Sequence, residues 1–82
     1  MPTILIQDGF RLFFYSEERN EPIHIHVAYG GAIAKFWISP RIILASNIGL
    51  KTQEIKKAKY IISVNLNLIT EKWNEFDKKR KS

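Results

Sequence analysis

Residues 23–38 read IHIHVAYGGAIAKFWI, and they carry the clearest structural pattern in the chain. Apolar residues alternate with others before the Gly30-Gly31 pair, which is the period of two that a β-strand requires. The isoleucine and valine side chains of that strand share one face, and His24 and His26 share the other. The glycine pair predicts a tight turn, because glycine adopts the positive φ values that hairpin turns need. The stretch therefore predicts a β-hairpin.

A second hairpin precedes this one along the chain. The β-branched run Thr3-Ile4-Leu5-Ile6 ends at Asp8-Gly9, a strong hairpin dipeptide, and an aromatic-rich segment follows. In that segment Arg11 faces the opposite side from Phe10 and Leu12. Together the two hairpins predict a four-stranded antiparallel β-meander, with strands at 3–7, 10–15, 23–29 and 32–38.

The C-terminal part of the chain has the period of a helix. Pro40 ends the fourth strand, and the short run 42–45 fits either a fifth strand or a helical turn. Beyond Gly49, apolar residues recur every seven positions and form a stripe that we expect to cover the sheet. The members of this stripe are Ile55, Ala58, Ile62, Leu66, Ile69, Trp73 and Phe76. Thr52 is the expected N-cap.

At 82 residues the chain is long enough for one domain. The predicted fold class is α+β, a four-stranded antiparallel β-meander followed by one long C-terminal α-helix. Its parts are the β-meander at 1–40, a connector at 41–52, the helix at 53–79 and a basic tail at 80–82.

A second apolar row lies on another side of the predicted helix, at Ile61, Val64 and Leu68. A helix that is apolar on two sides is covered by more of its own chain or by a partner. The sequence favours a partner, either a second copy in a homodimer or another protein. The alternative is that the sheet curls around the helix or that the segment 41–50 covers this row.

Composition excludes several classes of site. The chain has no cysteine, so it forms no disulfide and holds no zinc through thiolates. No apolar stretch approaches the ~20 residues of a membrane span, and the N-terminal residues do not resemble a signal peptide, so a cytoplasmic protein is expected. The net charge of +5 is concentrated in residues 51–82, which hold nine basic and four acidic residues. Such a surface attracts polyanions, with RNA the obvious candidate, or is only a solvated helix face.

The two histidines are the best candidates for chemistry. His24 and His26 lie two apart in a strand, so their side chains leave the same face about 6.5–7 Å apart. One could withdraw a proton from a phosphodiester reaction while the other donates one, without a metal. Arg11 and Lys35 alternate in the same way on their strands and could stabilise the phosphate. These four residues form the predicted catalytic set.

Two other interpretations of the histidines remain open. His-x-His is a known metal-ligand spacing, but a site needs three or four ligands. Only Asp8, Glu17, Glu18 and Glu21 could complete one, so no metal and no cofactor is predicted. Alternatively, both histidines are structural, held by hydrogen bonds or by ring contacts. Trp37 and Trp73 could stack nucleobases, although tryptophans at such positions more often close a core.

These residues also carry a family resemblance that spans nearly the whole chain. They are Met1-Pro2-Thr3-Ile4, Phe14-Tyr15-Ser16, Glu21-Pro22-Ile23-His24-Ile25-His26-Val27, Ala34-Lys35-Phe36-Trp37 and Trp73-Asn74-Glu75-Phe76. In them the chain resembles the bacterial domain-of-unknown-function family 4160, and the His-x-His segment is the most specific part. The sequence departs from the family at Ile23, where a second proline is usual, and at Lys51, where a helix-capping serine is common.

The resemblance implies the toxin of a two-gene type II toxin–antitoxin module, of the DhiT-like kind, with a small cognate antitoxin as its partner. Three hypotheses follow. The first is a metal-independent ribonuclease or RNA-binding growth inhibitor that uses His24, His26, Arg11 and Lys35. The second is a non-catalytic toxin or regulator with structural histidines. The third is a small interaction protein that acts through its double-sided helix.

Overall fold

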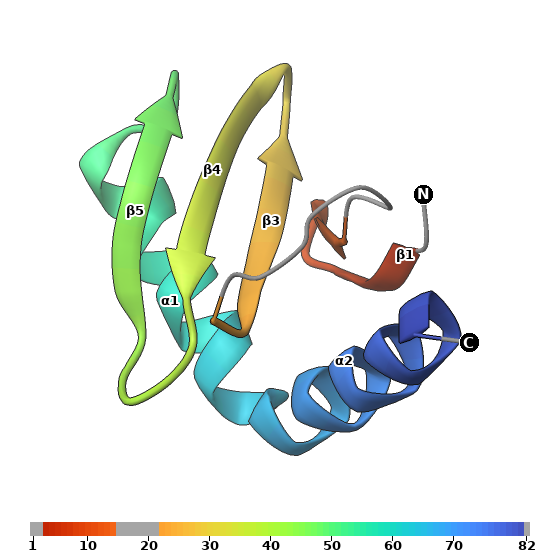
Figure 1. Ribbon diagram of the computed structural model, residues 1–82. Helices are drawn as coiled ribbons and strands as arrows, with labels where there is room; N and C mark the ends of the chain where they lie inside the picture. Colours follow the sequence, from red (N-terminus) through yellow and green to blue (C-terminus); the bar gives the residue numbers. More distant parts are fainter. Residues whose placement is uncertain (1–2, 15–21, 82) are drawn as a thin grey trace.

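The computed structural model describes residues 3–14 and 22–81, with side chains as far as residue 75. Its sheet contains five antiparallel strands in the order β1-β2-β3-β4-β5 (Figure 1). The strands are β1 Thr3–Gln7, β2 Phe10–Phe13, β3 His24–Tyr29, β4 Ala32–Trp37 and β5 Ile43–Ile48. The antiparallel meander is confirmed, but the prediction of four strands was wrong by one.

Both predicted hairpin turns have the backbone that their dipeptides require. Asp8 and Gly9 have φ values of 51° and 84°, and Gly30 and Gly31 have 50° and 85°. Two consecutive positive φ values are the signature of a type I′ turn, whose twist matches that of the flanking strands. The turns therefore fix which residues of β1–β2 and β3–β4 face each other.

The fifth strand lies within the segment that we expected to be a connector. β5 pairs with β4, with a register shift between Lys35 and Phe36. Directly after β5, Gly49 has φ +97°, and a Cβ atom at this position would lie 3.1 Å from the Cβ of Ala32. A side chain there would be strained and crowded, so glycine allows the chain to leave β5 tightly and start the helical part.

Two helices, not one, follow the sheet. They are α1 Thr52–Val64 and α2 Leu66–Lys81, and Asn65 separates them with φ −115° and ψ 18°. The side-chain Nδ2 of Asn65 donates to the carbonyl of Ile61 (2.8 Å) and to Gln7 Oε1 in β1 (3.0 Å). Asparagine competes for backbone groups in this way, which explains why the helical pattern does not continue as one rod.

The helix begins one residue earlier than expected. Lys51 occupies the N-cap position, and its backbone N–H donates to Glu54 Oε1 at 2.8 Å. Thr52 is therefore the first helical residue and not the cap. The Glu54 carboxylate satisfies a backbone donor that would otherwise lack a partner at the helix start.

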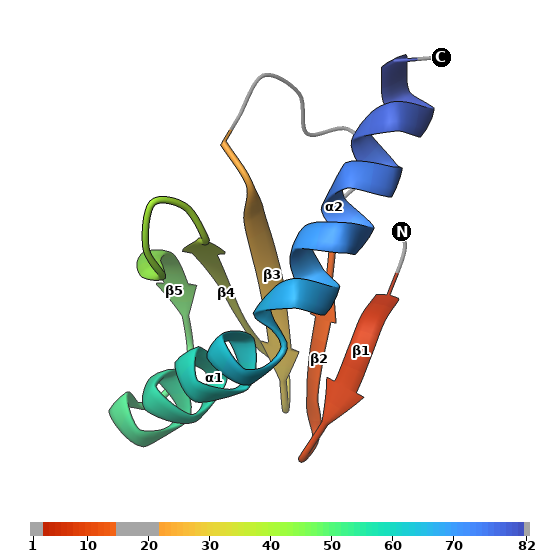
Figure 2. The same ribbon diagram turned by 90° about the horizontal axis from the view of Figure 1, so that it is seen from below.

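Both helices pack on the same face of the sheet, so the domain has two layers (Figure 2). The predicted stripe is largely confirmed, because Ala58, Ile62 and Ile69 are fully buried in the core. Leu66 is exposed instead, and the Phe76 side chain lies outside the described residues. The strands contribute Phe10, Leu12, Ile25, Val27, Ala34 and Phe36 to this core, and Phe14 and Ile38 join it directly after β2 and β4.

Ile61 does not belong to a separate surface row. Its side chain is 0% exposed and packs in the same core as Ile62, whereas Val64 is 54% exposed. A helix that lies flat on a sheet buries an arc of about 100° or more, so two adjacent positions can both face inward. The chain itself covers Ile61, which leaves Val64 and the partly buried Leu68 as the accessible part of the row.

Candidate functional site

The residues chosen from the sequence lie on one face of the sheet. In β3, Ile25 and Val27 point into the core under the helices, so His24 and His26 point to the opposite face. Across the strands, His26 lies opposite Phe13 on one side and Lys35 on the other. His24 lies opposite Trp37. Arg11 lies opposite Ala28, one position along the same face. The structure thus brings all four candidate residues to neighbouring positions.

Both histidines are nevertheless buried, with His24 1% and His26 8% exposed. His24 Nδ1 lies 2.9 Å from the carbonyl oxygen of Pro22. A carbonyl oxygen only accepts hydrogen bonds, so Nδ1 carries the proton and donates it. This bond fixes the tautomer and the orientation of the ring.

Aromatic rings enclose His24. Its ring centroid lies 5.1 Å from that of Trp73, 5.3 Å from that of His26 and 5.6 Å from that of Trp37, each at a steep angle. Such edge-to-face contacts are the arrangement that aromatic rings prefer. The His24 imidazole therefore fills a place in a cluster of packed rings.

His26 is held on its other side by Phe13. The two rings are stacked, with centroids 5.6 Å apart and planes 27° from parallel. Phe13 is itself buried, although it lies on the face away from the helices. We refer to Phe13, Phe14, His24, His26, Trp37 and Trp73 as the histidine cluster.

The two cationic side chains lie over aromatic rings of this cluster. The Arg11 guanidinium is 4.5 Å from the centroid of Phe13, and Lys35 Nζ is 4.5 Å from the centroid of Trp37. Arg11 Nε also donates to Thr3 Oγ1 at 3.0 Å. A cation over the face of an aromatic ring is attracted to its electron density. Arg11 and Lys35 thus form a charged rim beside the buried imidazoles.

Trp73 connects the cluster to the helical layer. It comes from α2, is partly buried, and meets the Phe14 ring edge-on with centroids 5.3 Å apart. Sequence reasoning assigned Trp73 and Trp37 to packing but did not place either beside the histidines. Alternation places Phe13 on the same side of β2 as Arg11 and Trp37 on the same side of β4 as Lys35. Only the strand register and the course of α2 bring Trp37 and Trp73 against His24.

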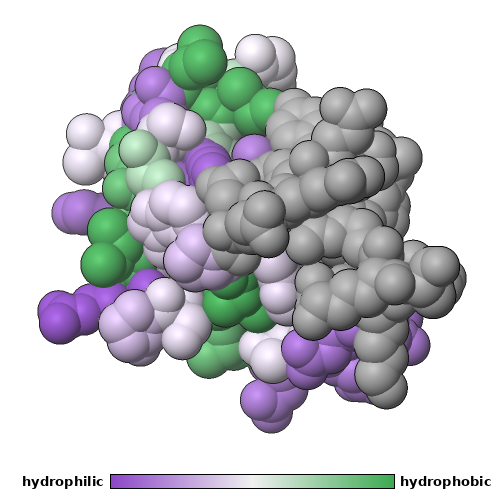
Figure 3. All heavy atoms as spheres, in the orientation of Figure 1, coloured by the Kyte–Doolittle hydropathy of each residue, from purple (hydrophilic) through white to green (hydrophobic). Residues whose placement is uncertain are grey.

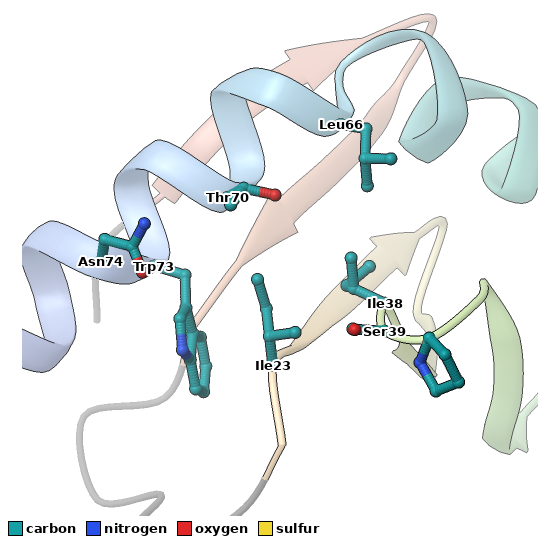
Figure 4. Close-up of a pocket in the computed structure, with 8 residues that line it drawn as sticks. Ile23, Ile38, Ser39, Leu66, Thr70, Trp73 and Asn74 are labelled. Carbon is teal, nitrogen blue, oxygen red and sulfur yellow. The ribbon is translucent and has the colours of Figure 1, made fainter.

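A pocket opens beside Trp73, between α2 and the ends of β3 and β4 (Figure 4). Its volume is about 480 Å³, within the range of about 300–1,000 Å³ that small-ligand sites occupy. The lining residues are Ile23, Ile38, Ser39, Pro40, Leu66, Thr70, Trp73 and Asn74. None of these side chains is titratable near neutral pH, so this Trp73 pocket can bind a neutral group but supplies no acid or base.

A metal site finds no support in the described part of the chain, where no three His, Asp or Glu residues lie together. Asp8, one of the carboxylates that could have completed such a site, pairs with Lys57 of α1 at 3.2 Å. Glu17, Glu18 and Glu21 lie outside the described residues. Within the helices that the structure describes, none is both long and apolar enough to pass through a membrane.

The model of the family described as Domain of unknown function (DUF4160) matches residues 9–74. The chain belongs to this family. The DUF4160 match runs from the start of β2 into α2 and includes every residue of the histidine cluster. It confirms the family resemblance and carries no activity with it. No curated protein and no solved structure matches the chain.

Proposed function

We propose that this DUF4160 domain is the toxin of a two-gene toxin–antitoxin module and that it inhibits growth by binding, without catalysis. The toxin assignment rests on the family resemblance. The non-catalytic mode rests on one observation, the burial of both histidines in an aromatic cluster. A general acid or base must come within hydrogen-bond reach of the proton that it transfers. Enclosed imidazoles do not meet this requirement.

In this account the histidine cluster serves the fold. His24 ties the start of β3 to α2 through Trp73, and its hydrogen bond to Pro22 holds the segment that leads into the strand. The cluster therefore shapes the wall of the Trp73 pocket, because the same tryptophan lines both. Its contribution to function is to position a binding surface.

The cognate antitoxin is the proposed partner at this surface. Val64 and Leu66 are exposed at the α1–α2 junction, and Leu66 also lines the Trp73 pocket. Exposed apolar residues that continue into a pocket are typical of sites where a partner inserts an apolar anchor. The excess of basic residues in 51–82 suits a polyanionic target such as RNA for the free toxin.

A ribonuclease is the second candidate, and one observation favours it. Lys35 lies directly opposite His26, and Arg11 follows on the same face, so two cations flank the imidazoles that a phosphodiester reaction would need. Such an enzyme would have to open the histidine cluster before it could bind a substrate. The two functions differ in what they require of His26.

Induced expression of the wild-type chain in a bacterial host should inhibit growth, and co-expression of the cognate antitoxin should relieve the inhibition. We expect His26→Gln, which keeps a polar side chain but cannot act as an acid or base, to inhibit growth about as strongly as wild type per folded molecule. The measurement is growth after induction, normalised to soluble protein, with cellular RNA examined for cleavage by primer extension.

Two results would contradict this account. A wild-type chain that leaves growth unaffected argues against the toxin. A natively folded His26→Gln protein that loses about 10²–10⁴-fold in activity supports the ribonuclease, because that is the usual cost of removing one proton-transfer group.

A further inference from the structure

β5 forms one edge of the sheet. β5 is the last strand of the sheet, pairs only with β4, and all six of its residues are exposed. Among the described residues, no strand pairs with the outer edge of β5, and the first turn of α1 projects past this edge in the helical layer behind the strand (Figures 1 and 2). Such an edge presents unpaired backbone N–H and C=O groups, which are a template for another strand.

β5 also lacks most of the features that protect natural edge strands. Its sequence, ILASNI, contains no lysine, no other charged residue and no proline, and its single irregularity is the register shift at Ala45. Ile48 is 72% exposed, and Ile43 and Leu44 are exposed as well. Figure 3 shows hydrophobic residues on this side of the molecule, interspersed with hydrophilic ones.

The register shift gives β5 a self-complementary pattern. Ile48 lies opposite Ile33 and Ile43 lies opposite Trp37, so both isoleucines are on the face that carries the histidines. Without the shift, an odd and an even position of one strand would face opposite ways. In an antiparallel pair of two β5 strands centred on Ala45 and Ser46, Ile43 of each copy meets Ile48 of the other. Leu44 and Asn47 meet in the same way on the opposite face.

We propose that two copies of the chain associate through their β5 strands, antiparallel about a two-fold axis, to form one continuous sheet. Each copy contributes the same surface, as a two-fold interface requires. On the face that carries the histidines, Ile33 and Ile48 of one copy form a continuous apolar row with Ile43 and Trp37 of the second copy. The two-fold axis produces a second, identical row.

The absence of charged residues in β5 and the rigidity of its end both permit pairing with a second copy. Each chain has a net charge of +5, and β5 is a segment where two such chains meet without placing like charges opposite each other. The strand is also fixed at its end, because the Asn47 side chain accepts from the backbone N–H of Leu50 and donates to its carbonyl, at 2.9 and 3.0 Å. A pre-formed edge loses little conformational freedom on pairing.

Sedimentation equilibrium over a range of concentrations tests the proposal, with Ile48→Lys as the disrupting variant. We expect a wild-type dimer whose dissociation constant rises roughly tenfold or more in Ile48→Lys, since the two-fold axis places this lysine against Ile43 at both ends of the paired strands. Ile6→Lys is the matched control, because Ile6 is 69% exposed on β1 at the other edge and lies on the same face. Raising the salt concentration should strengthen the dimer by screening the repulsion between the chains.

A melting curve of each variant confirms that the native fold is kept. This is expected because Ile48 and Ile6 are both exposed to solvent in the monomer. A wild type that stays monomeric at every concentration overturns the proposal. A dimer that persists in Ile48→Lys also overturns it, since that result would place the interface elsewhere. Dissociation of the dimer by Ile6→Lys would overturn it for the same reason. An interface at the α1–α2 junction would instead respond to Val64→Lys.

Discussion

Replacing His24 by alanine is expected to lower the free energy of unfolding by about 3 kcal/mol, the usual cost of truncating a large buried side chain. The variant loses ring contacts with His26, Trp37 and Trp73 and leaves the carbonyl of Pro22 without its donor. For a domain of this size, the loss corresponds to a decrease in melting temperature of roughly 12–24 °C. Chemical denaturation followed by circular dichroism measures the change in the free energy of unfolding, and thermal denaturation measures the change in melting temperature.

His24→Phe is the control for this prediction. Phenylalanine keeps an aromatic ring in the cluster but cannot donate to Pro22, so we expect a loss of about 1–3 kcal/mol from the unsatisfied carbonyl alone. The order of stability should be wild type, then His24→Phe, then His24→Ala. If His24→Ala unfolds with the stability of wild type, the imidazole is not a packing element and the structural role is wrong.

Ile61→Asp should unfold the protein, whereas Val64→Asp should change the free energy of unfolding by no more than about 0.5 kcal/mol. The two residues lie almost one turn apart on α1, but Ile61 is 0% exposed and Val64 is 54% exposed. An unpaired carboxylate in the core costs more than about 4 kcal/mol. This is a large part of the free energy of unfolding of a chain of 82 residues. Circular dichroism of the purified variants distinguishes the two.

This pair of variants also separates a core residue from a partner-binding residue. Sequence reasoning placed Ile61, Val64 and Leu68 in one row for a homodimer or an antitoxin, so loss of binding in Ile61→Asp would have seemed informative. Because the chain itself covers Ile61, that loss would only report unfolding. A folded Ile61→Asp protein would contradict the observed packing, and Val64→Asp is the variant suited to binding experiments.

The parts of the fold that local sequence determines were predicted well. Alternating side chains gave the strands of the meander, and Asp8-Gly9 and Gly30-Gly31 gave its two tight turns. Each of these features depends on residues that are neighbours in the sequence. They therefore leave a pattern that can be read without knowing the rest of the structure.

The features that were missed depend on contacts distant in the sequence. β5 is too short and too exposed to show a clear period, and its pairing with β4 decides its conformation. The break at Asn65 is stabilised by a bond to Gln7 of β1, a residue far away in the chain. A helical pattern that continues on both sides of such a residue does not reveal that the axis changes direction there.

The same distinction applies to the candidate site. The strand register brings Arg11 and Lys35 to the face of the two histidines. Alternation alone was enough to place His24 and His26 on the same face of their strand. It was not enough to predict burial. The rings that enclose His24 come from β4 and α2, and only the strand register and the helix packing bring Trp37 and Trp73 to it.

Both histidines are buried members of a packed cluster, and their reactivity with diethyl pyrocarbonate is a sensitive test of that burial. The chain has two histidines, so the ultraviolet signal of carbethoxylation reports His24 and His26 alone. At neutral pH we predict a rate far below that of N-acetylhistidine for the native protein, and modification of both residues once denaturant unfolds it. Modification of either histidine at the free rate in the native protein would contradict the account and restore the ribonuclease as the better explanation.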